Sequence, residues 1–128
     1  MTEISSGSLT QRAADSAPLL QEVWTALRDR LVKSGLPDLL DPGKQPFSFT
    51  NLRRDVYDGS EALYGEWRDP NGRLLGNLIV HEDGNTFAEF DVVQPHPTDQ
   101  RWFVEGVSAW GKSGAIKSEL KLLPALGA

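Results

Sequence analysis

Apolar side chains recur at helical spacing in the first third of the chain. The spacing i, i+3, i+4, i+7 and i+11 is followed by Leu20, Val23, Trp24, Leu27 and Leu31. Pro18 near the start of this stripe and Gly35 just past its end are typical of helix boundaries. We therefore predict one amphipathic helix over residues 17–34. Its apolar stripe needs a sheet to cover, because no other segment has a comparable helical pattern.

From residue 47 onward the pattern changes to an alternation typical of strands. Predicted strands cover residues 47–56, 61–68, 73–81, 85–93, 101–110 and 115–123. The turns between them are short and rich in Gly, Pro, Asn and Asp, so strands adjacent in sequence should pair antiparallel. The apolar phase slips near Asn51, which indicates a bulge. The last strand separates Ile116 and Leu120 from Lys117 and Lys121, as edge strands usually do.

These elements predict an α+β fold, with one N-terminal amphipathic helix packed on a five- to six-stranded antiparallel meander sheet. The length of 128 residues is typical of one domain. Residues 1–14 are rich in Ser, Thr, Gly and Gln and have little to bury. We expect them to form a mobile N-terminal tail, and residues 15–128 to form a single α+β domain.

The hairpin made by residues 73–81 and 85–93 can pair in two ways. A two-residue loop at Asp83-Gly84 would place Glu89 and Asp91 on the same face as Leu78. A three-residue loop at residues 82–84 leaves one face free of charge, and a slip of one residue moves every side chain across the sheet. We therefore predict the three-residue loop. The mixed face then carries Leu75, Asn77, Ile79, His81, Phe87, Glu89 and Asp91.

A loop of the same kind at residues 70–72 would add Trp67 to this mixed face. The proline-containing loop at residues 94–100 brings His96 as a further polar candidate. The predicted binding residues are therefore Trp67, Asn77, His81, Phe87, Glu89, Asp91 and His96. Trp102 and Trp110 share a face of their strand, which suits either a core, the favoured interpretation, or an aromatic-lined pocket.

Catalytic and metal chemistry receive little support from the residue pattern. Glu89 and Asp91 stand about 6–7 Å apart on one strand, a separation that suits acid–base catalysis as well as a solvated face, and we favour the latter. His81 could join them as a metal ligand, but no second histidine stands at ligand spacing. Residues 106–113 match the G-x4-G-K-S pattern, yet strands are predicted on both sides, so the match is coincidental. We expect no catalytic residues, metal or cofactor.

Charge and composition narrow the classes of partner. The formal net charge is −5 and the sequence pI is near 4.9, which argues against nucleic acid as a partner. There are no cysteines, the N-terminus has no apolar signal segment, and no apolar run is long enough to span a membrane. We expect a soluble, cytoplasmic protein without membrane attachment.

The segment from Tyr64 to Pro124 contains RDPNGR, HEDGNTFAEFDVVQPHP and RWFVE. In these features it resembles small bacterial proteins of the pseudomonad type whose family has no assigned function. The resemblance covers about half of the chain and implies no activity.

The sequence favours a non-enzymatic binding or interaction module that uses the polar and aromatic sheet face away from the helix. The partner would be an unknown protein or small molecule, and the two acids suggest a basic or polar one. The alternative is a small-ligand-binding protein or small enzyme with a pocket between the helix and a curled sheet, lined by Tyr64, Trp102 and Trp110. A homodimer through an edge strand is a further hypothesis.

Overall fold

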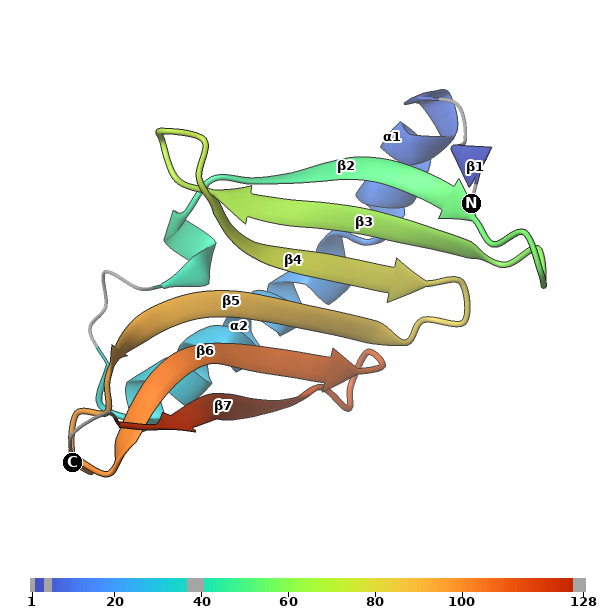
Figure 1. Ribbon diagram of the computed structural model, residues 1–128. Helices are drawn as coiled ribbons and strands as arrows, with labels where there is room; N and C mark the ends of the chain where they lie inside the picture. Colours follow the sequence, from blue (N-terminus) through green and yellow to red (C-terminus); the bar gives the residue numbers. More distant parts are fainter. Residues whose placement is uncertain (1, 4–5, 37–40, 126–128) are drawn as a thin grey trace.

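The computed structural model describes residues 2–3, 6–36 and 41–125 (Figure 1). The helical elements are α1 (Ser6–Asp15), α2 (Ala17–Lys33) and the short 3-10 helix η2 (Pro42–Lys44). The strands are β1 (Thr2–Glu3), β2 (Phe47–Arg54), β3 (Glu61–Arg68), β4 (Leu74–His81), β5 (Thr86–Pro95), β6 (Trp102–Gly111) and β7 (Lys117–Pro124). They form one antiparallel sheet in sequence order. The predicted α+β meander is confirmed, with six full-length strands and the two-residue β1.

Helix α2 matches the predicted amphipathic helix closely. Four residues of its apolar stripe are buried: Leu20, Val23, Leu27 and Leu31. Gly35 has a φ of 78°, the left-handed conformation that ends many helices. The helix does not begin at a free cap, because α1 runs up to Asp15 and the Ser16 N–H donates to the Arg12 carbonyl at 3.0 Å.

The first residues of the chain have more secondary structure than their composition indicates. Thr2 and Glu3 pair with Arg54 and Arg53 of β2, and α1 follows at once. Arg12 of α1 forms an ion pair with Glu61 of β3 at 2.8 Å. This contact ties α1 to the start of β3. The mobility that we expect of residues 1–14 stays a prediction.

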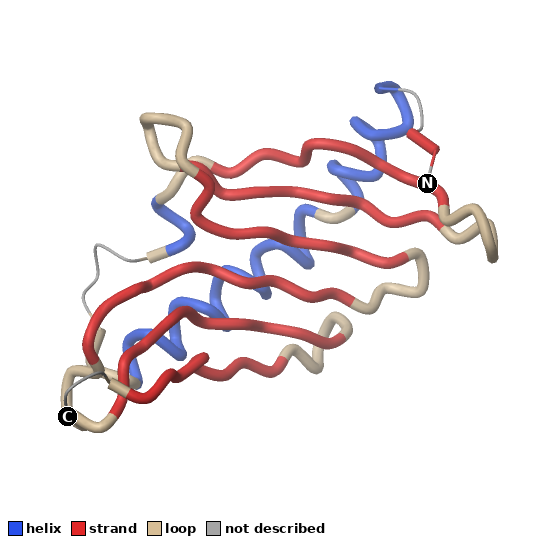
Figure 2. Tube along the Cα trace, in the orientation of Figure 1, coloured by secondary structure: helices blue, strands red, loops and turns tan. Residues whose placement is uncertain are grey.

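The hydrophobic core lies between α2 and one face of the sheet. Figure 2 shows α2 running diagonally behind the strands, while the opposite face of the sheet has no helix over it. The sheet contributes buried side chains to this core from every full-length strand except β7, among them Leu52, Leu63, Trp67, Leu78, Val80, Ala88, Phe90, Val104 and Val107. We call the face turned away from α2 the open face.

The register of the β4–β5 hairpin is the predicted one. The His81 N–H donates to the Asn85 carbonyl at 2.8 Å, which closes a three-residue loop at residues 82–84. Beyond the loop Ile79 pairs with Phe87, and Asn77 pairs with Glu89. The charged side chains of this hairpin therefore lie on the open face, because residues directly opposite each other share a face.

The prediction that Trp67 lies on the open face is wrong. Its side chain is 0% exposed, and its indole N–H donates to the Pro42 carbonyl at 3.1 Å. Arg68 pairs with Leu74 as the predicted loop requires, but Trp67 pairs with Gly76. Leu75 is the extra residue of a bulge between these pairs, and it packs against the core. One inserted residue moves all of β3 onto the other face.

The predicted bulge in β2 and the predicted edge strand are both present. The β2–β3 register shifts between Phe49 and Asn51, where the sequence changes phase. Strand β7 pairs with β6 and stands at the end of the sheet. Within residues 2–3, 6–36 and 41–125, none of the helices is long and apolar enough to cross a membrane.

Candidate functional site

A cleft of about 520 Å³ lies on the open face and crosses strands β2 to β5. We call it the open-face cleft. Its walls are Thr50, Asn51, Arg53, Tyr64, Gly65, Glu66, Asn77, Leu78, Ile79, Phe87 and Glu89. Three of the predicted binding residues, Asn77, Phe87 and Glu89, are among them. The side chain of Phe87 is 41% exposed, which leaves the ring accessible to a partner.

The strand pairing arranges the cleft in two rows across β3, β4 and β5. Tyr64 pairs with Ile79, which pairs with Phe87, and these form the apolar row. The carboxylate row lies two residues further along each strand. It is formed by Glu66, which pairs with Asn77, which in turn pairs with Glu89. The two rows are about 7 Å apart, the length of two residues in a strand. An aromatic surface therefore lies directly beside two carboxylates and an amide.

Each carboxylate of this row is held by a cation from the chain itself. Arg68 binds Glu66 through two guanidinium nitrogens, at 3.1 and 3.3 Å. Lys121 of the edge strand β7 reaches across β6 to donate to Glu89, and this hydrogen bond raises the pKa of Lys121. Both cations are partly exposed, so these pairs orient the carboxylates along the surface at little gain in stability.

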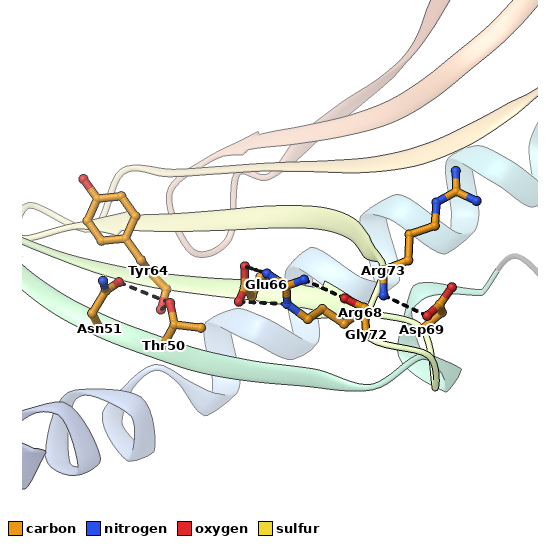
Figure 3. Close-up of polar contacts among 8 residues, drawn as sticks. All are labelled: Thr50, Asn51, Tyr64, Glu66, Arg68, Asp69, Gly72 and Arg73. Carbon is orange, nitrogen blue, oxygen red and sulfur yellow. Dashed lines mark hydrogen bonds and ion pairs between the residues drawn. The ribbon is translucent and has the colours of Figure 1, made fainter.

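An internal arginine already occupies one wall of the cleft. The Arg53 guanidinium carbon lies 5.3 Å from the centre of the Tyr64 ring. With its amide oxygen turned toward Arg53, Asn51 accepts from the guanidinium at 3.0 and 2.8 Å. Figure 3 shows Thr50 and Asn51 beside Tyr64, with the Glu66–Arg68 pair further along β3. The cleft thus accommodates a guanidinium against an aromatic ring, the contact called cation–π.

His81 and Asp91 lie on the same face as this cleft but outside it. His81 is four residues from Asn77 along β4, about 13 Å away, and pairs with Ala62. It lines a separate cleft of about 460 Å³ with Asp58, Ser60, Glu82, Asp83 and Asn85. Asp91 pairs with Gly106 and is exposed beyond Glu89. The four polar residues predicted to gather on one face share it, but they do not converge.

His96 lies in the loop before β6, away from the other candidates. Its Nδ1 accepts hydrogen bonds from the backbone N–H groups of Thr98 at 3.2 Å and Asp99 at 3.0 Å. Through these two hydrogen bonds the His96 side chain stabilises its own loop. The side chain also borders an apolar groove of about 560 Å³ with Trp102, Phe103 and Leu123.

The three aromatic residues predicted to share a pocket lie in three different places. Tyr64 lines the open-face cleft, Trp102 the apolar groove near His96, and Trp110 a groove beside α2. Neither Trp102 nor Trp110 belongs to the core cluster of the described residues, contrary to the favoured interpretation. The pocket between helix and sheet does not form from this trio.

Two residues of the cleft, Arg53 and Glu66, were not among the candidates from the sequence, and Tyr64 was expected in a different pocket. The alternation in β3 does place Tyr64 and Glu66 on one face, opposite Trp67, but the assumed loop assigned the wrong set to the surface. The alternation in β3 therefore did identify which residues share a face. The bulge at Leu75 determines which of the two faces is exposed. Arg53 faces the cleft because the β2 bulge changes the phase of the strand after Phe49.

The described parts of the chain contain no group of three or more His, Cys, Asp or Glu side chains that could hold a metal ion. No family model matches the chain, and searches of curated proteins and of solved structures give no significant match.

Proposed function

We propose that the protein is a binding module whose open-face cleft docks a basic segment of a partner protein. The observation that carries this proposal is the apolar row lying directly beside the carboxylate row. The remaining predicted residues of the open face, His81 and Asp91, would contact the outer parts of the same partner.

The two rows suit the two parts of an arginine or lysine side chain. Such side chains lay their methylene stem on apolar surface and extend the charged head toward polar groups. Here Ile79 and Phe87 would contact the stem, and the head would reach Glu66 or Glu89 about 7 Å further along the strands. Carboxylates bind guanidinium groups in pairs of charge-assisted hydrogen bonds. The Arg53–Tyr64 contact provides an example of this chemistry within the chain.

The overall charge favours the same class of partner. With a net charge of −5, the protein attracts basic surfaces from beyond contact distance and repels acidic ones. Asp91 and Glu119, both exposed on strands beside the cleft, extend the negative surface. An incoming cation can displace Arg68 from Glu66 and Lys121 from Glu89, because both of these pairs are partly exposed.

A peptide titration followed by two-dimensional NMR tests the proposal. The probe is a short synthetic peptide of alternating glycine and arginine, and its control has citrulline in place of arginine, which keeps the shape and removes the charge. We expect the arginine peptide to shift the amide signals of Asn77, Phe87 and Glu89, and the citrulline peptide to leave them unchanged. Glu89→Gln should weaken binding about fivefold, as the loss of one partly exposed charge pair does.

Asp29→Asn is the matched charge control, because Asp29 is an exposed acid on α2, outside the cleft. It changes the net charge by the same amount as Glu89→Gln and should leave the affinity within twofold of the wild type. Equal binding of both peptides, or equal weakening by both variants, would reject the cleft as a specific site for cations. Shifts confined to other surfaces would reject it as well.

A further inference from the structure

Strand β7 forms one edge of the sheet, and no described strand pairs with its outer side (Figure 1). The opposite edge is protected, because β1 pairs with one end of β2 and a bulge between Phe49 and Asn51 interrupts the rest. The β6–β7 pairing also contains a bulge, but its extra residue, Glu105, belongs to β6. The edge-strand homodimer suggested by the sequence therefore has one candidate edge, the outer side of β7.

The outer side of β7 carries the backbone N–H and C=O groups of Ser118, Leu120 and Leu122. Just past the end of the strand, the Ala125 N–H donates to the Arg101 carbonyl at 3.0 Å and so points to the β6 side. The backbone groups of successive residues in a strand point to opposite sides. Every second residue back from Ala125 is therefore directed to β6, and the three residues between face outward. Such a row of unpaired groups is a template for another strand.

The side chains of β7 alternate in charge on the open face. Phe87 of this face pairs with Trp110, which pairs with Lys117, so Lys117, Glu119 and Lys121 all lie on the open face. Neither Lys117 nor Glu119 forms an ion pair with any residue that the structure describes. Lysines on an edge strand usually discourage pairing. A glutamate between two lysines changes this, because such an edge can be complementary to an antiparallel copy of itself.

The order of charges limits where the twofold axis of such a pair can lie. With Glu119 on the axis, the two glutamates would face each other and Lys117 would face Lys121. With Lys121 on the axis, the two Lys121 side chains would face each other. Like charges directly opposite each other destabilise a sheet. With Leu120 on the axis, Glu119 of each copy instead faces Lys121 of the other, which gives two pairs of opposite charge.

An axis at Ser118 would also place opposite charges face to face, but it would bring two arginines together. Arg30 Nε donates to the Ser118 hydroxyl at 3.2 Å, and opposite residues have their Cβ atoms about 5 Å apart. An axis at Leu120 separates the two Ser118 residues by about 13 Å along the strands. It also places Leu122 and Leu123, which are 39% and 46% exposed, against the strand of the second copy.

We propose that the protein forms a symmetric dimer in which the β7 strands of two copies pair antiparallel with Leu120 on the twofold axis. The pairing would run from Lys117 to Leu123 and would end at Pro124, which has no N–H to donate. Because paired residues share a face, both open faces would lie on one side of the joined sheet and both α2 helices on the other. None of residues 117–123 lines the open-face cleft, so the dimer does not rest on the function proposed for that cleft.

Sedimentation of the full chain over a concentration series tests for the dimer. We expect a monomer–dimer equilibrium with the dimer populated below about 1 mM. Hydrogen exchange then locates the interface. The amides of Leu120 and Leu122 should exchange more slowly at high protein concentration than at low concentration, whereas those at the β2 edge should not change. A monomer at every concentration up to about 1 mM would overturn the proposal, as would a dimer without added protection of these two amides.

Two charge reversals test the register. Glu119→Lys and Lys121→Glu should each weaken dimerisation about tenfold, because each replaces two attractive pairs by two repulsive ones. Both side chains are at the surface, so the fold should tolerate the changes. An equal mixture of the two variants should dimerise as well as the wild type. In the mixed dimer the new lysine of one copy faces the new glutamate of the other, and the native pair remains beside it.

Asp15→Lys is the matched control, because Asp15 is an exposed acid on α1, which lies against β2 near the opposite edge. It changes the net charge by the same amount as Glu119→Lys and should leave dimerisation within twofold of the wild type. Equal weakening by this control would reject the specific charge pairs. Wild-type affinity of Lys121→Glu, or a mixture that dimerises no better than either variant alone, would reject the axis at Leu120.

Discussion

The carboxylate of Glu22 on α2 accepts a hydrogen bond from the hydroxyl of Ser113 in the β6–β7 turn. The same carboxylate accepts the backbone N–H of Gly114 at 2.7 Å. This turn belongs to the segment that matches the G-x4-G-K-S pattern, and strands flank it on both sides. The anion that its donors bind is a carboxylate of the chain itself, which ties the last hairpin to the helix.

Replacement of Glu22 by glutamine should loosen that hairpin. A neutral amide accepts weaker hydrogen bonds than a carboxylate, so the amide of Gly114 should exchange with deuterium faster in Glu22→Gln than in the wild type. Amides in the centre of β4, far from the turn, should keep their exchange rates. A uniform acceleration over the whole sheet would instead indicate a global loss of stability and contradict the local role.

The Asp99–Arg101 pair should make stability depend on pH in the acid range. Hydrogen bonds from the side chain and backbone of Arg101 lower the pKa of Asp99 from 3.8 to about 2. A carboxyl group with a lowered pKa stabilises the fold fully above its unfolded pKa, and the contribution is lost as pH falls from about 4 to about 2. Asp99→Asn should therefore be less stable than the wild type at pH 7, and the difference should vanish near pH 2.

Denaturant unfolding at a series of pH values measures this difference directly. Arg101→Gln serves as the matched variant from the other side of the pair, because it removes the side-chain donor that is the main cause of the low pKa. It should show the same convergence toward the wild type in acid. A constant offset from pH 7 down to pH 2 in both variants would show that the pair does not carry the pH dependence.

Trp67 and Phe87 should respond to mutation in opposite ways. Trp67→Phe removes the indole donor to the buried Pro42 carbonyl and leaves unfilled volume in the core, so unfolding free energy should fall by about 2–3 kcal/mol. Phe87→Ala removes an exposed ring and should cost less than about 1 kcal/mol. Urea unfolding distinguishes the two. A small effect of Trp67→Phe would place the indole outside the core.

Gly76 should not tolerate a side chain. A Cβ at this position would stand 2.3 Å from the Glu89 carbonyl oxygen of β5, so the two strands would have to separate. Gly76→Ala should therefore destabilise the fold by about 1–3 kcal/mol, the cost of overpacking. Asn77→Ala, at the exposed neighbouring position, should change stability by less than about 0.5 kcal/mol. Equal effects of the two variants would show that the strands have room to adjust.

Much of the architecture follows from the sequence through short-range rules. The spacing of Leu20, Val23, Leu27 and Leu31 identifies α2, and the phase slip near Asn51 identifies the β2 bulge. The β4–β5 register follows from the segregation of charge, because a one-residue slip would bury Glu89. In each case one arrangement separates the apolar side chains from the charged ones better than the alternative arrangements do.

The face occupied by β3 was decided only in the tertiary structure. Alternation in β3 places Tyr64 and Glu66 on one face and Gly65 and Trp67 on the other. Either face could be the exposed one, so alternation alone does not decide which face packs on the core. The bulge at Leu75 turns Trp67 toward the core, where the Pro42 carbonyl accepts its N–H. This choice also assembles the open-face cleft, because it places Tyr64 and Glu66 beside Ile79 and Asn77. A contact between residues 25 positions apart thus settles what the local pattern leaves open.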